Sequence, residues 1–148
     1  MKINFGKLEG GAHIFPAHVF YNHTDAGGIV YYANYLRIAE EARVAMFDMM
    51  CAGDVACRNT LAAGADFVVR KCEVDYFRPA KYGDDLTIES RITEVGKTSL
   101  EITQKVWRGE ENLVVVKTKI VYVSIAEMKP ARVPDFWLEK IKMLNGLA

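Results

Sequence analysis

The chain has 148 residues, of which 51% are hydrophobic, so it is long and apolar enough to bury the core of one domain. Nineteen basic residues balance nineteen acidic ones, which gives no reason to expect a nucleic-acid partner. No run approaches the roughly 18 apolar residues of a membrane-spanning helix, and the N-terminal segment lacks the apolar stretch of a signal peptide.

The first part of the chain predicts a strand, a loop and a long helix. Residues 1–13 are polar and rich in glycine, which predicts a loose lead-in. Residues 14–21 predict a short strand, and the Asn, Asp and Gly residues over 22–28 predict a loop. Over 32–51 apolar residues recur at steps of three and four, as on one face of a helix: Tyr35, Ile38, Ala39, Ala42, Ala45, Met46 and Met49. The small residues of 52–65 predict a connection.

The second part of the chain predicts four strands and a short helix. Turn residues separate the strands, which cover about 66–78, 86–95, 98–108 and 113–125. Residues 113–116 are apolar on both faces, which predicts a central or interface strand. Pro134 favours the first position of a C-terminal helix over 134–146.

This order of elements predicts an α+β fold in which one antiparallel five-stranded sheet wraps around the long helix. No repeat or low-complexity linker divides the chain, so we expect a single domain over 1–148. The face of the sheet that does not cover the helix is expected to be apolar or mixed. Such a face favours pairing with a second copy of the chain.

The stretch with the most chemical character joins the first strand to the long helix. In it Asp25 precedes Gly27 and Gly28, and the apolar run Ile29-Val30-Tyr31-Tyr32 leads into the helix. An aspartate followed by glycines is ordinarily a turn residue or a helix cap. Here the glycines let a substrate approach, the apolar run excludes water, and the helix start offers free N–H groups to a carbonyl oxygen. Such a site suits the hydrolysis of an ester or a thioester.

Three motifs resemble the 4-hydroxybenzoyl-CoA thioesterase family of hot-dog acyl-CoA thioesterases, and also the related Tol-Pal-associated thioesterases. They are D-A-G-G-I-V-Y-Y-A-N-Y over 25–35, E-x-x-R at Glu40 and Arg43, and V-D-Y-F-R-P-A-K-Y-G-D-D-L over 74–86. The resemblance implies a hot-dog fold. It also implies an enzyme that hydrolyses an aromatic acyl-CoA such as 4-hydroxybenzoyl-CoA, or a short-chain aliphatic acyl-CoA, to free acid and CoA. It implies no cofactor, because coenzyme A is part of the substrate. It also implies a homodimer or homotetramer whose pocket lies between subunits.

The resemblance further implies roles for single residues. Asp25 matches the catalytic aspartate, which acts either as nucleophile or as general base toward water. Gly28 matches a glycine beside the acyl group, and Tyr32 matches the position whose backbone N–H polarises the thioester carbonyl. The hairpin turn over 96–99 matches the turn that contacts the nucleotide end of coenzyme A. The expected substrate-binding residues are His23, Gly27, Tyr31, Lys97, Thr98 and Ser99.

Other residues and other functions compete with this interpretation. Glu40 is a rival acid, because another hot-dog branch uses a helical glutamate, but its spacing from Arg43 favours an ion pair on the helix. The three histidines recur every five residues and alternate between the faces of a strand, so we expect no metal site. A hot-dog dehydratase or hydratase needs a pocket histidine paired with an acid, and no histidine follows His23. A non-catalytic acyl-CoA-binding module would keep the Lys97 turn without needing Asp25.

The cysteines bear on the cellular compartment. Cys51, Cys57 and Cys72 are odd in number and form no CxxC pair, which argues against a disulfide framework or a zinc site. We interpret all three as packing residues of a cytoplasmic protein.

Overall fold

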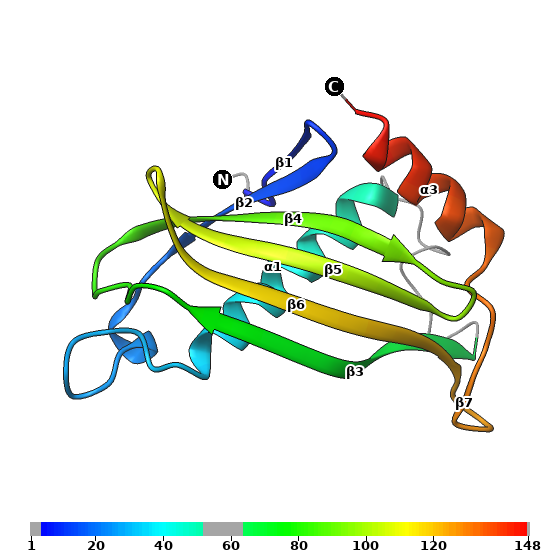
Figure 1. The fold of residues 1–148 in the computed structure, drawn as a ribbon, viewed down its shortest axis with the longest axis horizontal. Helices are drawn as coiled ribbons and strands as arrows, with labels where there is room; N and C mark the ends of the chain where they lie inside the picture. Colours follow the sequence, from blue (N-terminus) through cyan, green and yellow to red (C-terminus); the bar gives the residue numbers. More distant parts are fainter. Residues whose placement is uncertain (1–3, 52–63, 148) are drawn as a thin grey trace.

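The computed structural model describes residues 4–51 and 64–147, which form a curved sheet around one long helix (Figure 1). This is the expected α+β arrangement. In chain order the elements are β1 (Lys7–Glu9), β2 (Ala12–His18), the 3-10 turn η1 (Tyr21–His23), α1 (Asn34–Cys51), β3 (Ala65–Tyr76), β4 (Asp85–Val95), β5 (Ser99–Arg108), β6 (Glu111–Ser124), β7 (Lys129–Pro130) and α3 (Asp135–Asn145).

The sheet has seven strands rather than the five expected, because two short strands extend it. Its order is β1-β2-β4-β5-β6-β3, with β7 paired to β6, and every pairing is antiparallel. β6 lies between β5 and β3, which confirms that residues 113–116 belong to a central strand. β3, drawn in green, forms the edge of the sheet opposite β1 (Figure 1).

The core lies between α1 and the concave face of the sheet. The inward positions of β4 and β5 are buried as the alternation predicted: Leu86, Ile88, Ile92, Leu100, Ile102 and Val106. α1 contributes the predicted stripe except at its end, where Met50 is buried and Met49 is only half-buried. The expected connection over 52–65 falls almost entirely outside the described residues.

The N-terminal segment is more ordered than expected, so the interpretation of residues 7–13 as a loose lead-in is wrong. β1 and β2 form a hairpin in which Glu9 pairs with Ala12. Gly10 and Gly11 make its two-residue turn, with φ angles of 58° and 75°. A tight hairpin turn of this kind needs positive φ at both positions, so the glycines mark a turn rather than a flexible tail.

The cysteines differ from one another. Cys51 is buried at the end of α1 and is disulfide-bonded, so the interpretation of Cys51 as only a packing residue is wrong. Cys72 on β3 is free and exposed, and Cys57 lies outside the described residues. A cytoplasmic location therefore stays a prediction.

Over residues 4–51 and 64–147, no helix is both long and apolar enough to cross a membrane.

His13 on β2 is fully buried, and it predicts a pH dependence of stability. Its Nε2 lies 2.7 Å from the Phe5 carbonyl oxygen, while its Nδ1 has no partner among the described residues. Burial lowers the pKa of His13 below 6.5, and the bond to Phe5 only partly opposes this. The folded state therefore keeps the imidazole neutral where the unfolded chain already binds a proton, and stability falls as the pH drops below about 6.5.

We expect the urea midpoint of the wild type to fall between about pH 7.5 and pH 5.5, and the fall to be smaller in His13→Gln. His18→Gln is the matched control, because His18 lies on the same strand but is exposed. Equal pH dependence in the wild type and His13→Gln would contradict the prediction.

Candidate active site

Asp25 lies in a tight loop, residues 24–30, that its own backbone closes. The Asp25 N–H donates to the Ile29 carbonyl at 2.9 Å, and the Asp25 carbonyl accepts from the Gly28 N–H at 3.1 Å. Oδ1 of the carboxylate accepts the Gly27 N–H at 2.8 Å. Oδ2 has no partner in the described part of the chain, and the side chain is exposed. Asp25 is thus a turn residue that still presents a free carboxylate oxygen.

The two glycines after Asp25 leave space in front of the loop. Gly28 has a φ of 78°, a conformation that other residues rarely adopt, so the loop needs glycine here. A Cβ at Gly28 would meet nothing within 4 Å, and one at Gly27 would meet only Oδ1 of Asp25. A substrate can therefore approach the carboxylate without touching a side chain at these positions.

The start of α1 lies beside this loop and offers a free donor. The His23 carbonyl accepts both the Tyr31 N–H at 2.9 Å and the Asn34 side-chain amide at 2.8 Å. The Asn34 N–H in turn donates to the Tyr31 carbonyl at 2.8 Å. The Tyr32 N–H has no acceptor within residues 4–51 and 64–147. It is an unpaired N–H at the positive end of a helix, the group that stabilises a developing oxyanion.

His23 acts on the loop through its backbone and not through its ring. Its Nδ1 accepts the Phe20 N–H at 3.1 Å, which closes the 3-10 turn before Asp25. The ring also contacts the Phe20 ring, with 5.8 Å between centroids. The imidazole therefore orders the segment that leads into the site.

Partly exposed tyrosines gather between the helix start and the end of β3. The Tyr31 and Tyr32 rings lie 4.9 Å apart between centroids, and the Tyr32 and Tyr76 rings 6.3 Å apart. The Tyr76 hydroxyl donates to the Tyr32 carbonyl at 3.1 Å. Tyr31, Tyr32 and Tyr76 are 46%, 61% and 47% exposed. This apolar surface borders the free edge of the sheet.

The predicted nucleotide-binding turn is well ordered. The carbonyls of Lys97 and Thr98 accept the N–H groups of Val133 and Tyr122, each at 2.8 Å. The Ser99 carbonyl closes the hairpin from inside by accepting the Gly96 N–H at 2.7 Å. The Lys97 side chain is exposed and forms no ion pair with the described residues.

Within one protomer, the turn over residues 96–99 does not lie near Asp25. β4 begins near the Asp25 loop and runs for 11 residues before the turn, a span of roughly 36 Å. The loop and the turn lie at opposite ends of the sheet (Figure 1). The predicted binding residues near 25 and those near 97 therefore form two groups within a protomer.

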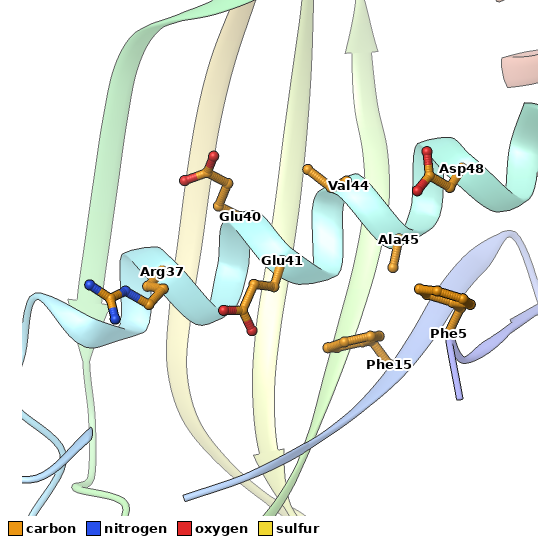
Figure 2. A pocket seen from close by; sticks show the side chains of 8 residues that line it. All are labelled: Phe5, Phe15, Arg37, Glu40, Glu41, Val44, Ala45 and Asp48. Atoms are coloured by element: carbon orange, nitrogen blue, oxygen red, sulfur yellow. The ribbon is translucent and has the colours of Figure 1, made fainter. Parts of the chain in front are cut away.

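Away from the Asp25 loop, the protomer has a hollow of about 520 Å³. Figure 2 shows this hollow between α1 and the N-terminal strands, with Phe5 and Phe15 on one side. Glu40 lines this hollow and is about 9 Å along the helix axis from the first residue of α1. The expected ion pair between Glu40 and Arg43 does not form among the described residues, although the Glu40 charge acts on Arg43 at longer range. Glu40, the rival acid, therefore does not lie at the start of α1.

The sequence profile of the thioesterase superfamily matches residues 27–115. The chain belongs to the thioesterase superfamily. It is 36% identical over 129 residues to the acyl-CoA thioester hydrolase YbgC of Escherichia coli, covering 86% of this chain and 94% of that relative. It is 33% identical over 122 residues to the acyl-CoA thioesterase YbgC of Haemophilus influenzae, covering 81% and 87%.

Solved structures agree with the sequence matches. The probable thioesterase of Bartonella henselae superposes with a TM-score of 0.72 at 35% identity, covering 83% of this chain and 99% of that one. The predicted hot-dog fold, the predicted family and the prediction of a thioester-hydrolysing enzyme are confirmed.

The sequence did not show that the turn over residues 79–84 contacts the candidate site. The Val30 N–H donates to the Ala80 carbonyl at 2.9 Å, and the Tyr82 N–H donates to the Gly28 carbonyl at 3.2 Å. Ile29 and Lys81 form an antiparallel bridge between them. The residues P-A-K-Y-G-D-D predicted a turn and formed part of a family motif, but they did not predict these contacts, because a bond between segments fifty residues apart leaves no local pattern.

Proposed function

We propose that this thioesterase hydrolyses an acyl-CoA to the free acid and CoA, with Asp25 as the catalytic carboxylate and the Tyr32 N–H as oxyanion donor. The observation that carries the proposal is the pairing of a free carboxylate oxygen and a free helix-start N–H beside one short loop. The names of the E. coli and H. influenzae relatives support acyl-CoA as the substrate class.

Two routes use these groups. As general base, Asp25 takes a proton from water while the water oxygen bonds to the thioester carbon. The tetrahedral oxyanion then accepts the Tyr32 N–H, the C–S bond breaks, and the thiolate takes the proton from Asp25. As nucleophile, Asp25 displaces the thiolate to give a mixed anhydride, which water then cleaves. Neither route calls on a metal or a redox cofactor.

The rings of Tyr31 and Tyr76 form a wall against which an aromatic or a short aliphatic acyl group packs, and Gly28 leaves room beside it. The rival dehydratase or hydratase needs a histidine and an acid in a closed pocket. His18 lies 2.7 Å from Asp85, with side chains that are 43% and 92% exposed. The names of the E. coli and H. influenzae relatives describe a thioester hydrolase and a thioesterase, and not a hydratase. The hydrolase is therefore the better supported function.

A second copy of the chain completes the site in this proposal. Within the described residues β3 bonds to β6 along one edge only, and Val68 and Val69 beside its free edge are 39% and 54% exposed. If β3 of a second subunit pairs antiparallel with this free edge, the strands of the partner's sheet run opposite to those of the first subunit. The partner's Lys97 turn then lies toward the Asp25 end of the first subunit, where it can contact the nucleotide of the bound CoA.

The test is thiol release from benzoyl-CoA, phenylacetyl-CoA and short-chain acyl-CoAs. We expect release from at least one class, and the ratios of kcat/KM then identify the acyl preference. Absence of release from every thioester would refute the proposal. Addition of water to an enoyl-CoA without thiol release would support the hydratase instead.

Lys97→Ala tests the binding role of the turn. We expect KM to rise roughly threefold to tenfold with kcat unchanged, because an exposed contact to a phosphate stabilises the ground state and the transition state equally. Lys105→Ala is the matched control, an exposed lysine on β5. An unchanged KM in Lys97→Ala would remove this turn from the binding site.

A further inference from the structure

The 79–84 turn is bonded to both halves of the candidate site. Its Ala80 carbonyl holds the Asp25 loop through the Val30 N–H. The Ala80 N–H donates to the Tyr35 hydroxyl at 2.9 Å, and Tyr35 lies in the first turn of α1 with 2% of its surface exposed. One peptide segment therefore contacts the loop that carries the carboxylate and the helix whose start carries the free N–H. Together with the bonds from Tyr31 and Asn34 to the His23 carbonyl, this turn fixes the loop relative to the helix start.

Asp84 and Arg108 clamp this turn. Oδ2 of Asp84 accepts the Lys81 N–H at 2.8 Å and Nη1 of Arg108 at 2.9 Å. The same Nη1 donates to the Pro79 carbonyl at 3.3 Å. A single guanidinium nitrogen thus joins the first and last residues of the turn, while the carboxylate bonds a backbone N–H inside it.

The charges of this clamp are partly shielded and stay in place at neutral pH. The Asp84 and Arg108 side chains are 23% and 28% exposed. Burial by itself would raise the pKa of Asp84, but the Lys81 N–H and Arg108 outweigh it, so the pKa lies below 3.8. The carboxylate is therefore ionised throughout the range in which a thioesterase would be assayed.

The same network has an outer part that does not touch the turn. Glu111 accepts Nη2 of Arg108 at 3.3 Å and Nη1 of Arg78 at 3.1 Å. The Glu111 and Arg78 side chains are 45% and 68% exposed, and ion pairs this exposed contribute little to stability. Glu111 therefore provides a control within the network.

We propose that the Asp84–Arg108 pair is the positioning device of the site, because it fixes the turn that holds the Asp25 loop against the start of α1. The proposal rests on the proposed role of Asp25. Neither side chain needs to touch the substrate. Because a displacement of about 1 Å can cost on the order of a hundredfold in rate, loosening this turn should slow the chemical step more than it weakens binding.

Steady-state kinetics separate positioning from general stability. We expect Asp84→Asn to lower kcat about tenfold to a hundredfold with KM within about threefold. Arg108→Lys should lower kcat less, because the ammonium keeps the positive charge that faces Asp84 although it loses the guanidinium fork. Glu111→Gln should keep kcat within about twofold. Assays are run well below the melting temperature of each variant. Equal losses in Asp84→Asn and Glu111→Gln, or a wild-type kcat in Asp84→Asn, would overturn the proposal.

Amide hydrogen exchange gives a readout that does not depend on catalysis. We expect the Val30 and Tyr82 N–H groups to exchange faster in Asp84→Asn and in Arg108→Lys than in the wild type. The Ile102 N–H in the core of β5 should keep its rate. If the wild type hydrolyses no thioester, the proposed function fails while exchange still decides the role of the clamp. If the Val30 and Tyr82 N–H groups exchange at the wild-type rate in both variants, the proposed role of the Asp84–Arg108 pair is wrong, whatever the activity of the variants.

Discussion

Asp25→Asn is expected to lower the kcat of thioester hydrolysis by about a thousandfold, because the amide can neither take a proton from water nor form a mixed anhydride. The substitution keeps the size of the side chain and an oxygen that can accept the Gly27 N–H, so the loop should keep its shape. KM should change little, since no bond to the ground-state substrate is removed. The measurement is thiol release at saturating acyl-CoA, on the best substrate of the panel.

Two further variants show whether the loss of kcat is specific to the substitution of Asp25. Asp135→Asn makes the same change at an exposed position in the first turn of α3 and should leave kcat within about twofold. Glu40→Gln tests the rival acid on α1 and should also leave kcat near that of the wild type. A larger loss in Glu40→Gln than in Asp25→Asn would move the chemistry to the helix.

Much of the fold follows from periodicity. Side chains on β4 and β5 alternate between the core and solvent, so the sequence alone identifies the buried residues of these strands. α1 begins at Asn34 rather than near 32, because the two residues before it form the turn that leads into the helix. The local geometry of Asp25, Gly28 and Tyr32 could also be expected, since all three lie within one short segment.

Contacts between distant segments could not be expected in the same way. The Gly10-Gly11 pair suggested a loose tail, because nothing nearby showed that residues 7–9 would pair with Ala12 and its neighbours. Asp84 ends a turn and Arg108 is the last residue of β5, and neither segment has a pattern that points to the other. Hydrogen bonds of this kind depend on the finished fold. The sequence therefore reveals the candidate catalytic groups but not the residues that hold them.

The distance between Asp25 and Lys97 also depends on the finished fold, and it determines whether one subunit can form the whole site. The resemblance implied that both serve one site between subunits, and within one protomer β4 and β5 carry the Lys97 turn to the far end of the sheet (Figure 1). A single protomer also leaves Asp25 and the neighbouring tyrosines open to water. Electrostatic stabilisation of an oxyanion is strongest where water is excluded. If the proposed chemistry is correct, a second subunit must cover this surface.

Val69→Lys should therefore give a monomer whose kcat/KM is lower by about a hundredfold. A lysine beside the free edge of β3 blocks strand pairing, and in an antiparallel dimer it enters the interface twice and must lose its hydration. Light scattering after size-exclusion chromatography measures the mass, and thiol release measures the activity. Melting curves establish that the monomer remains folded.

Met143→Lys is the control, because Met143 is 72% exposed but lies on α3 and not on β3. It should keep both the dimer and its kcat/KM. A short bismaleimide should join two wild-type chains through Cys72, which is free and exposed on β3, and should fail to join chains of Cys72→Ser. A Val69→Lys monomer with full activity would show that one protomer contains the whole site, and the partner's Lys97 turn would then have no part in it.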